Sequence, residues 1–127
     1  MVLTATTGPA LWVTSWPFAE YTKHAWAGAW VNSCFRNEGA GLSSELIREA
    51  VSATRWIWDP PPLGMITFVD ATKVRPKADP GYCYQVAGFN RVGKTKVNKL
   101  LAFQLLPDEM PEPRPPIGSQ IGLWGVE

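Results

Sequence analysis

The sequence predicts a small mixed α/β domain with one strand–helix–strand unit and a pair of strands closer to the C-terminal end. An apolar run over residues 29–35 leads through a glycine-containing turn into a helical pattern, and a second apolar run occupies residues 64–70. Apolar runs on either side of one helix are typical of parallel strands joined by a right-handed crossover. A chain of 127 residues suits a single domain with one core.

Composition favours a globular protein and limits the classes of partner that it is expected to bind. The chain is 46% hydrophobic and 18% charged, and its formal net charge is +1. No overall attraction to nucleic acid or to a membrane is therefore expected. No apolar run approaches the length that spans a bilayer, so no membrane partner is expected. Cys34 and Cys83 lack metal-ligand spacing, which predicts reduced thiols, no metal site and a cytoplasmic location.

One segment is strongly basic in spite of the low net charge. A solvated lysine-rich hairpin is the simpler interpretation, and contact with phosphates is the alternative. Between residues 73 and 99 a single acid, Asp79, stands against these cations: Lys73, Arg75, Lys77, Arg91, Lys94, Lys96 and Lys99.

The N-terminal third is predicted to contain one strand and a short helix. Residues 1–10 are small and polar and are expected to be frayed. Residues 11–16 are rich in β-formers and stop at Pro17, which predicts a strand. Residues 18–26 are expected to form one or two helical turns. His24 in that stretch is a candidate base, although a packing histidine is the simpler interpretation.

The central helix is predicted from the residue after Leu42 onward. Apolar residues recur there at helical spacing as far as Ile57, and Ser43 or Ser44 can cap its start. A run of three prolines at residues 60–62 ends the element.

The C-terminal half is predicted to add a short helical piece and two strands. The helical piece covers residues 81–87, and the strands cover residues 89–96 and 100–106 with a turn near Asn98. Residues 1–106 are therefore expected to form the single domain. Residues 107–127 are expected to be a proline-rich tail without a core of its own, whose apolar end from residue 121 docks elsewhere, for instance on a partner.

The turn that precedes the central helix has the properties of an anion site. The first N–H groups of a helix have no intrahelical partner and carry roughly half a positive charge between them. Gly39 and Gly41 lack a Cβ atom, so a phosphate can approach the main chain closely. An ordinary turn that needs glycine only for its shape is the alternative interpretation.

Two motifs of the chain resemble those of the GNAT superfamily of N-acetyltransferases. Arg36-x-x-Gly39-x-Gly41 is similar to its R/Q-x-x-G-x-G/A signature, and Tyr84-x-x-x-Gly88-Phe89 is similar to its later Y-x-x-x-G-F motif. The resemblance implies a truncated GNAT-like core, because most of the elements that precede this strand in a full domain are missing. It also implies acetyl-CoA, or another acyl-CoA, as the donor. The implied donor-binding residues are Cys34, Phe35, Arg36, Gly39, Ala40, Gly41, Leu42, Ser43 and Ser44.

The same resemblance implies roles for two further side chains. Tyr84 lies where the superfamily has the general acid that protonates the departing CoA thiolate. Asp70 ends a predicted sheet strand, where ligands bind in open α/β sheets, and is the best candidate for the base. N–H groups near residues 34–36 can polarise the thioester carbonyl. A core aromatic and a strand-ending turn residue are the simpler interpretations of Tyr84 and Asp70.

Within the superfamily, the chain most resembles the phage Mom-type DNA-modification acyltransferases. The residues that carry this similarity are 67–70 (TFVD), Gly81, Tyr84, 88–89 (GF) and 93–95 (GKT). That family modifies the exocyclic amine of adenine in DNA. The resemblance therefore implies an amine acceptor, in DNA as the most specific case, and the host cytoplasm as the location of a phage-encoded protein. It leaves open whether the chain forms a homodimer.

Two other hypotheses remain open from the sequence. Residues 88–95 satisfy the P-loop expression G-x-x-x-x-G-K-[ST], which has meaning only between a strand and a helix. The shortened N-terminal region also fits a catalytically silent GNAT-like accessory or binding protein.

Overall fold

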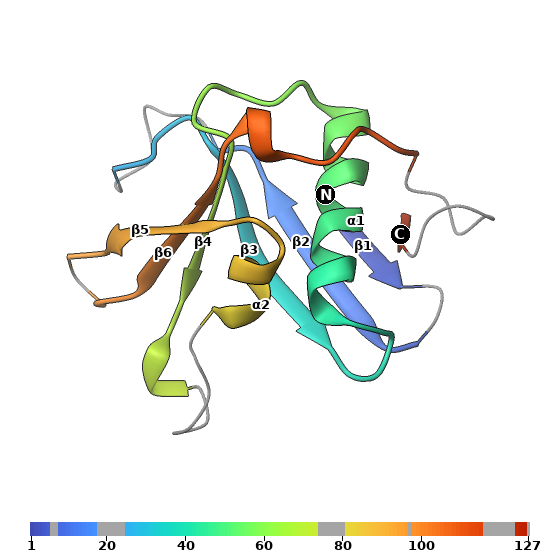
Figure 1. Cartoon of the computed structure of the whole chain (residues 1–127), viewed down its shortest axis with the longest axis horizontal. Coiled ribbons are helices and arrows are strands. Elements are labelled where there is room, and N and C mark those ends of the chain that lie inside the picture. The colour runs from blue at the N-terminus through green and yellow to red at the C-terminus, as the bar shows by residue number, and fades with distance from the viewer. Residues whose placement is uncertain (6–7, 18–24, 74–80, 97, 116–123, 127) are drawn as a thin grey trace.

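The computed structural model describes residues 1–5, 8–17, 25–73, 81–96, 98–115 and 124–126. These residues form a seven-stranded sheet in the order β5-β6-β4-β3-β2-β1-β7, with two helices packed on one face (Figure 1). The helices are α1 (Ser43–Ile57) and α2 (Tyr82–Val86). The strands are β1 (Val2–Ala5), β2 (Ala10–Ser15), β3 (Trp30–Asn37), β4 (Met65–Val69), β5 (Asn90–Lys94), β6 (Leu101–Leu105) and β7 (Trp124–Val126). Short 3-10 turns follow β4 at Ala71–Lys73 and β6 at Pro107–Glu109.

The predicted strand–helix–strand unit and the C-terminal strand pair are confirmed. β3 and β4 are parallel, with Trp30 opposite Met65 and Asn32 opposite Thr67, and α1 connects them. β5 and β6 form an antiparallel pair, and β6 continues the sheet antiparallel to β4. The architecture is therefore a mixed α/β sheet in which one parallel pair joins two antiparallel parts.

The N-terminal residues do not fray as expected. Val2–Ala5 forms β1, which pairs antiparallel with β2 and places Leu3 opposite Trp12. Both of these side chains are fully buried. The N-terminal amine donates a hydrogen bond to the Thr14 carbonyl at 2.6 Å. Burial of a large apolar side chain such as Leu3 contributes about 1.5–3 kcal/mol, which outweighs the weak strand signal of its neighbours.

The proline-rich segment after β6 lies across α1 (Figure 1). Met110 is buried against the core, and the Arg114 N–H donates to the Ser52 carbonyl at 3.1 Å. Arg55 Nη1 in turn donates to the Pro111 carbonyl at 3.1 Å. The apolar end expected to dock elsewhere contributes β7, which pairs with β1 of the same chain. His24, the expected helical turns at residues 18–24, most of the basic loop from residue 74 and residues 121–123 lie outside the described residues.

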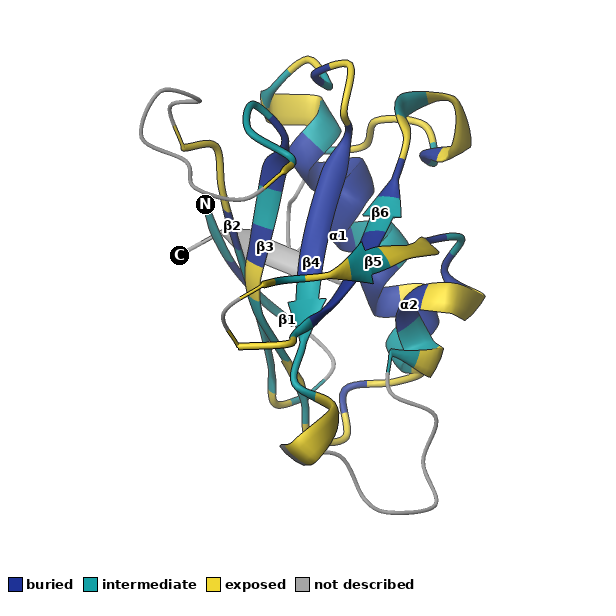
Figure 2. Ribbon diagram, turned by 90° about the vertical axis from the view of Figure 1, so that its left-hand side faces the viewer, coloured by how far each residue is buried: buried dark blue, intermediate teal, exposed yellow. Residues whose placement is uncertain are grey.

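The main core lies between the sheet and α1 (Figure 2). The helix is amphipathic and presents Leu46, Ile47, Ala50 and Val51, all fully buried, to side chains of the strands. A smaller apolar cluster on the opposite face of the sheet contains Ala29, Ile66 and Ala102, because neighbouring residues of a strand point to opposite faces. The core therefore fixes α1, and with it the turn at its start, against β3.

The P-loop expression does not have the geometry it requires. Its residues 88–95 run from the end of α2 into β5, with Gly93 inside that strand. The next element in the described part of the chain is another strand, β6, where a P-loop needs a helix. The physical reason is the antiparallel pairing of β5 with β6, which gives this segment an extended backbone.

Candidate active site

β3 and β4 diverge halfway along the sheet (Figure 1). Their pairing stops at Asn32 and Thr67, although β3 continues to Asn37 along β2, and β4 continues to Val69 along β6. A cleft of about 380 Å³ lies at the divergence. Nine described residues line it: Asn32, Ser33, Cys34, Phe35, Thr67, Phe68, Val69, Asp70 and Tyr84.

A β-bulge in β3 marks the point of divergence. Cys34 pairs with Val13 and Asn32 pairs with Thr14, so Ser33 has no partner in β2. A bulge bends a strand and increases its local twist. The Asn32 side chain bridges the bulge, since its Nδ2 donates to the carbonyl oxygens of Val13 at 2.9 Å and Cys34 at 3.0 Å. The buried amide of Asn32 thus stabilises the bend that separates β3 from β4.

Tyr84 places a buried hydroxyl at the cleft. α2 holds the ring in the core, where it makes edge contacts with Phe89 at 5.3 Å and Phe35 at 6.3 Å between ring centroids. The hydroxyl donates to Asn32 Oδ1 at 2.6 Å. Burial raises the pKa of Tyr84 above its ordinary value of 10.0, and a hydrogen bond from Thr67 lowers it in part. The phenol is therefore neutral at physiological pH and has a proton that it can give away.

Asp70 has a structural partner as well as a place in the cleft lining. Its Oδ1 accepts hydrogen bonds from the Thr72 N–H at 3.0 Å and the Thr72 hydroxyl at 2.6 Å. This pattern is an Asx turn that starts the 3-10 turn after β4. The carboxylate thus sits at the carboxyl end of its strand and is held there by the turn.

Asn37 organises the turn between β3 and α1. Its Oδ1 accepts from the N–H groups of Gly39 at 3.2 Å and Ala40 at 3.0 Å. Its Nδ2 donates to the Gly41 carbonyl at 2.7 Å and to Ser43 Oγ at 2.9 Å. Gly39 has a φ of 109°, which side chains rarely adopt, and a Cβ atom there would meet nothing within 4 Å. The turn therefore has a fixed shape and an open surface.

The start of α1 keeps unpaired N–H groups. Leu42 precedes the helix, is 63% exposed and makes no side-chain cap. The Leu46 N–H is the first that bonds back, to the Leu42 carbonyl at 3.1 Å. The N–H groups of Ser43, Ser44 and Glu45 therefore have no partner inside the helix and can bind an anion.

The expected donor-binding residues fall into separate groups. Cys34 and Phe35 lie in the cleft with Asp70 and Tyr84. Arg36 lies instead at a shallow hollow of about 210 Å³ beside Pro9–Leu11, and it is exposed and pairs with Glu38 at 3.7 Å. Of the remaining turn residues, Ala40 packs into the core and the N–H groups of Gly39 and Ala40 are held by Asn37. The N–H groups that remain available to an anion are therefore those of the first residues of α1, and not those of Gly39 and Ala40 in the turn.

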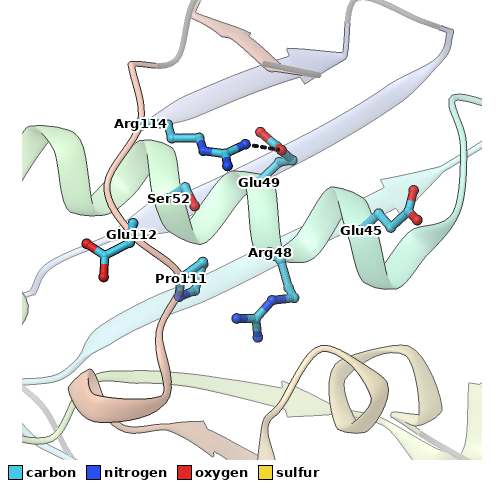
Figure 3. A pocket seen from close by; sticks show the side chains of 7 residues that line it. All are labelled: Glu45, Arg48, Glu49, Ser52, Pro111, Glu112 and Arg114. Atoms are coloured by element: carbon cyan, nitrogen blue, oxygen red, sulfur yellow. Dashed lines mark hydrogen bonds and ion pairs between the residues drawn. The ribbon is translucent and has the colours of Figure 1, made fainter. Parts of the chain in front are cut away.

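A charged groove of about 350 Å³ runs between α1 and the C-terminal segment. Figure 3 shows Arg114 reaching from that segment to Glu49, at 3.5 Å, while Arg48 points away from the pair. Arg48 Nη1 donates to the Ala87 carbonyl at 2.6 Å, so it connects α1 to the end of α2. Glu45 and Glu112 add negative charge, which makes the groove a poor site for a phosphate.

The sequence alone gives no role to Asn32 or Thr67. Both are polar, both are buried, and both lie inside apolar runs that predict ordinary buried strands. A buried amide or hydroxyl needs hydrogen-bond partners. A polar residue in the middle of each predicted parallel strand was therefore a usable signal of a polar cluster between them.

Comparisons of the chain with protein-family models, with curated proteins and with solved structures each give no match. No helix in the described part of the chain is long and apolar enough to cross a membrane. Among the residues that the structure describes, no three His, Cys, Asp or Glu side chains come together as a metal site.

Proposed function

We propose that this chain is an acyl-CoA-dependent N-acyltransferase with a GNAT-like core, acting on an amine. The observation that carries the proposal is the divergence of β3 and β4 beside the buried hydroxyl of Tyr84. The same strand, β3, runs on into a glycine turn and an uncapped helix start. A thioester donor needs both features: an open strand edge for its acyl arm and unpaired N–H groups for its diphosphate.

The donor is proposed to lie along β3. Its diphosphate accepts hydrogen bonds from the N–H groups of Ser43, Ser44 and Glu45, where the helix dipole favours negative charge. Its acyl arm enters the cleft lined by Cys34 and Phe35. The pairing of β3 with β4 ends at Asn32 and Thr67 in the described chain, and main-chain N–H groups of β3 near Cys34 are proposed to polarise the thioester carbonyl.

The proposed reaction is direct transfer from the thioester to the amine. The amine nitrogen attacks the carbonyl carbon, a C–N bond forms and the C–S bond breaks. Tyr84 gives its hydroxyl proton to the departing thiolate. Asp70, directly or through a water, takes the proton that the amine loses. The Tyr84 hydroxyl lines the cleft and is protonated at neutral pH, so it holds a proton where the thiolate departs in this proposal.

An exocyclic amine of a DNA base is the most specific acceptor that we propose. Lys94 pairs with Leu101, which pairs with Val69 of the cleft, so this lysine lies two strands away, about 10 Å, at the level of the cleft. Arg91 on β5 is exposed, as are Lys96 and Lys99 in the connection between β5 and β6, and neither ion pair found among the described residues involves them. Phe68 of the cleft contacts the Trp26 ring at 6.0 Å, a surface on which a base can stack.

Donor binding is tested with the variant Leu42→Asp. An aspartate at the residue before α1 caps the same N–H groups, so it raises stability by about 0.5–2 kcal/mol while it competes with a diphosphate. The expected result is a higher urea midpoint together with weaker acetyl-CoA binding in calorimetry. Leu106→Asp, at the other end of the sheet, is the matched control and leaves acetyl-CoA affinity unchanged. Equal acetyl-CoA affinity in wild type and Leu42→Asp would overturn the assigned diphosphate site.

Turnover is tested separately. Release of free CoA from acetyl-CoA is measured with amine acceptors, including single-stranded and duplex DNA, and nucleosides from treated DNA are examined by mass spectrometry for acylated bases. Tyr84→Phe is expected to lower the rate by about 10²-fold or more. ATP with Mg²⁺ is the comparison ligand and is expected to give no thermal shift.

A catalytically silent acyl-CoA-binding protein is the second candidate. The observation that favours it is the engagement of Asp70 Oδ1 by Thr72, which is a structural use of the proposed base. Acetyl-CoA binding that Leu42→Asp weakens, with no CoA release for any acceptor, would support this candidate over the enzyme.

A further inference from the structure

The Asn32 side chain uses its whole hydrogen-bonding capacity although it is only 3% exposed. Both hydrogens of Nδ2 are donated to carbonyl oxygens, those of Val13 and Cys34. Its Oδ1 accepts from the Tyr84 hydroxyl at 2.6 Å and lies 3.2 Å from Thr67 Oγ1. The amide cannot flip, because a flip would turn its oxygen toward two carbonyl oxygens. Asn32 therefore always presents an acceptor to Tyr84.

This contact sets the direction of the Tyr84 hydroxyl proton. A phenol has one proton, and in the structure this proton points at Asn32 Oδ1. Tyr84 must turn the proton away from Oδ1 before it can protonate a group in the cleft. Such a turn would leave Oδ1 short of a donor inside the protein, and an unsatisfied buried acceptor is unfavourable.

Thr67 is placed to replace the lost donor. Its hydroxyl is 3.1 Å from the Asn32 main-chain oxygen and 3.2 Å from Asn32 Oδ1, and its interaction with Tyr84 lowers the pKa of the phenol, so its one proton faces three acceptors. The Thr67 side chain is 2% exposed, so water does not compete for this proton. When Tyr84 turns away, the Thr67 proton can move from the main-chain oxygen to Oδ1.

We propose that Asn32 and Thr67 are positioning residues for Tyr84: Asn32 holds the phenol proton in the resting site, and Thr67 takes over that hydrogen bond when Tyr84 releases its proton into the cleft. The proposal rests on the acyltransferase function and on Tyr84 as its acid. Thr67 donates its hydrogen bond without losing its proton, so the only proton that leaves the cluster is the one that the thiolate receives.

Thr67→Val tests this exchange with little change of shape, and Thr67→Ser is the conservative variant that keeps the hydroxyl. We expect Thr67→Val to lower kcat about tenfold, with KM for acetyl-CoA within about twofold of wild type. This loss is smaller than the roughly 10²–10⁴-fold effect of a general acid, because Tyr84 itself is still present. Thr67→Ser is expected to restore kcat to within about twofold. Wild-type kcat in Thr67→Val would overturn the proposal.

A double-mutant cycle separates this role from a structural one. In the Tyr84→Phe background no phenol proton exists to be exchanged, so Thr67→Val is expected to cause no further loss of kcat. The same loss in both backgrounds would overturn the proposal. Near-UV circular dichroism and urea midpoints of all variants show whether each one folds as wild type does.

A readout that needs no turnover distinguishes failure of the proposed function from failure of this inference. The chain has three tyrosines, so Tyr21→Phe with Tyr82→Phe leaves Tyr84 as the only one. Its Raman doublet reports whether the phenol donates or accepts hydrogen bonds. We expect a strong donor, and a weaker donor signal when Asn32 is replaced by Leu, which removes the Oδ1 acceptor at similar side-chain size. A doublet that the Asn32→Leu change leaves unaltered would overturn the inference even if acyl transfer is found, and a donor signal without acyl transfer would leave only the enzyme assignment wrong.

Discussion

Arg48 of α1 donates a hydrogen bond from Nη1 to the main-chain oxygen of Ala87, 2.6 Å away. Ala87 is fully buried and ends α2, the helix that carries Tyr84. One guanidinium therefore fixes the position of α2 relative to the central helix, across 39 residues of sequence.

Removal of this guanidinium is expected to destabilise the fold. In Arg48→Met the Ala87 carbonyl stays buried without its donor, which costs about 1–3 kcal/mol of unfolding free energy. Urea unfolding measures the loss. Arg91→Met on the exposed face of β5 is the matched control and should stay within about 0.5 kcal/mol of wild type. Equal midpoints for the two variants would show that the Arg48 contact adds nothing to stability.

Gly64 is expected to tolerate no side chain. Its φ is 68°, and a Cβ atom would lie 2.0 Å from the Leu105 main-chain oxygen, so Gly64→Ala combines backbone strain with a clash that only movement of β6 can relieve. A loss of more than about 3 kcal/mol is expected, since strain alone accounts for about 1–3 kcal/mol. Gly39→Ala is the comparison, because Gly39 also has positive φ but open space around it. A smaller loss for Gly64→Ala than for Gly39→Ala would contradict the structure.

Stability is expected to fall in alkaline solution. Burial raises the pKa of Cys83 above 9.0 and that of Tyr84 above 10.0, so the folded state retains both protons to higher pH than the unfolded chain does. Their contribution is complete below pH 9 and is lost as pH rises above 9 for Cys83 and above 10 for Tyr84. For Tyr84 the slope approaches about 1.4 kcal/mol per pH unit. Urea midpoints between pH 7 and pH 11, roughly the range in which thiols and phenols titrate, measure it.

The Tyr84 part of this effect is isolated by comparing two variants. Tyr84→Phe should flatten the decline above pH 10, whereas Tyr82→Phe, at a side chain that is 62% exposed, should keep the wild-type slope. Parallel curves for Tyr84→Phe and wild type would mean that the phenol is not buried in solution.

Asn37 is expected to matter more for donor binding than an exposed amide would. Asn37→Asp removes the Nδ2 donor to the Gly41 carbonyl and Ser43 Oγ, and it adds a negative charge beside the start of α1. The charge repels a diphosphate, so acetyl-CoA affinity should fall at least about tenfold, or about 1.4 kcal/mol. Asn98→Asp, in the exposed turn before β6, carries the same charge change and should bind acetyl-CoA as wild type does. Unchanged affinity in Asn37→Asp would count against the donor site.

Much of the fold was predictable because strong local signals agree with the tertiary structure. The apolar runs before Gly39 and after Pro62 form β3 and β4, each of which begins with buried residues, and proline closes α1 where expected. β1 was not predictable in this way. Its four residues have a weak strand pattern, and what makes them a strand is pairing with β2 and burial of Leu3. Pairing of that kind is a tertiary effect that a local pattern does not contain.

The candidate site was predictable only in part, for a similar reason. Motif resemblance pointed to Tyr84, and its position at the end of a strand pointed to Asp70; both line the cleft. The roles of Asn32 and Thr67 depend on hydrogen bonds between residues 52 and 35 positions apart. The capture of two turn N–H groups by Asn37 likewise depends on the side-chain conformation rather than on the glycine spacing.

The short parallel pairing of β3 with β4 divides the sheet into two parts. Three consecutive residue pairs, from Trp30–Met65 to Asn32–Thr67, are the only ladder between β5-β6-β4 on one side and β3-β2-β1-β7 on the other in the described chain. The two parts of the sheet are therefore joined by a short ladder. A small rotation about this ladder changes the separation of the free ends of β3 and β4 far more than the spacing at the ladder itself. A ligand bound in that gap would restrict the relative motion of the two parts. Amide hydrogen exchange would then slow in both parts at once, including in strands that the ligand does not contact.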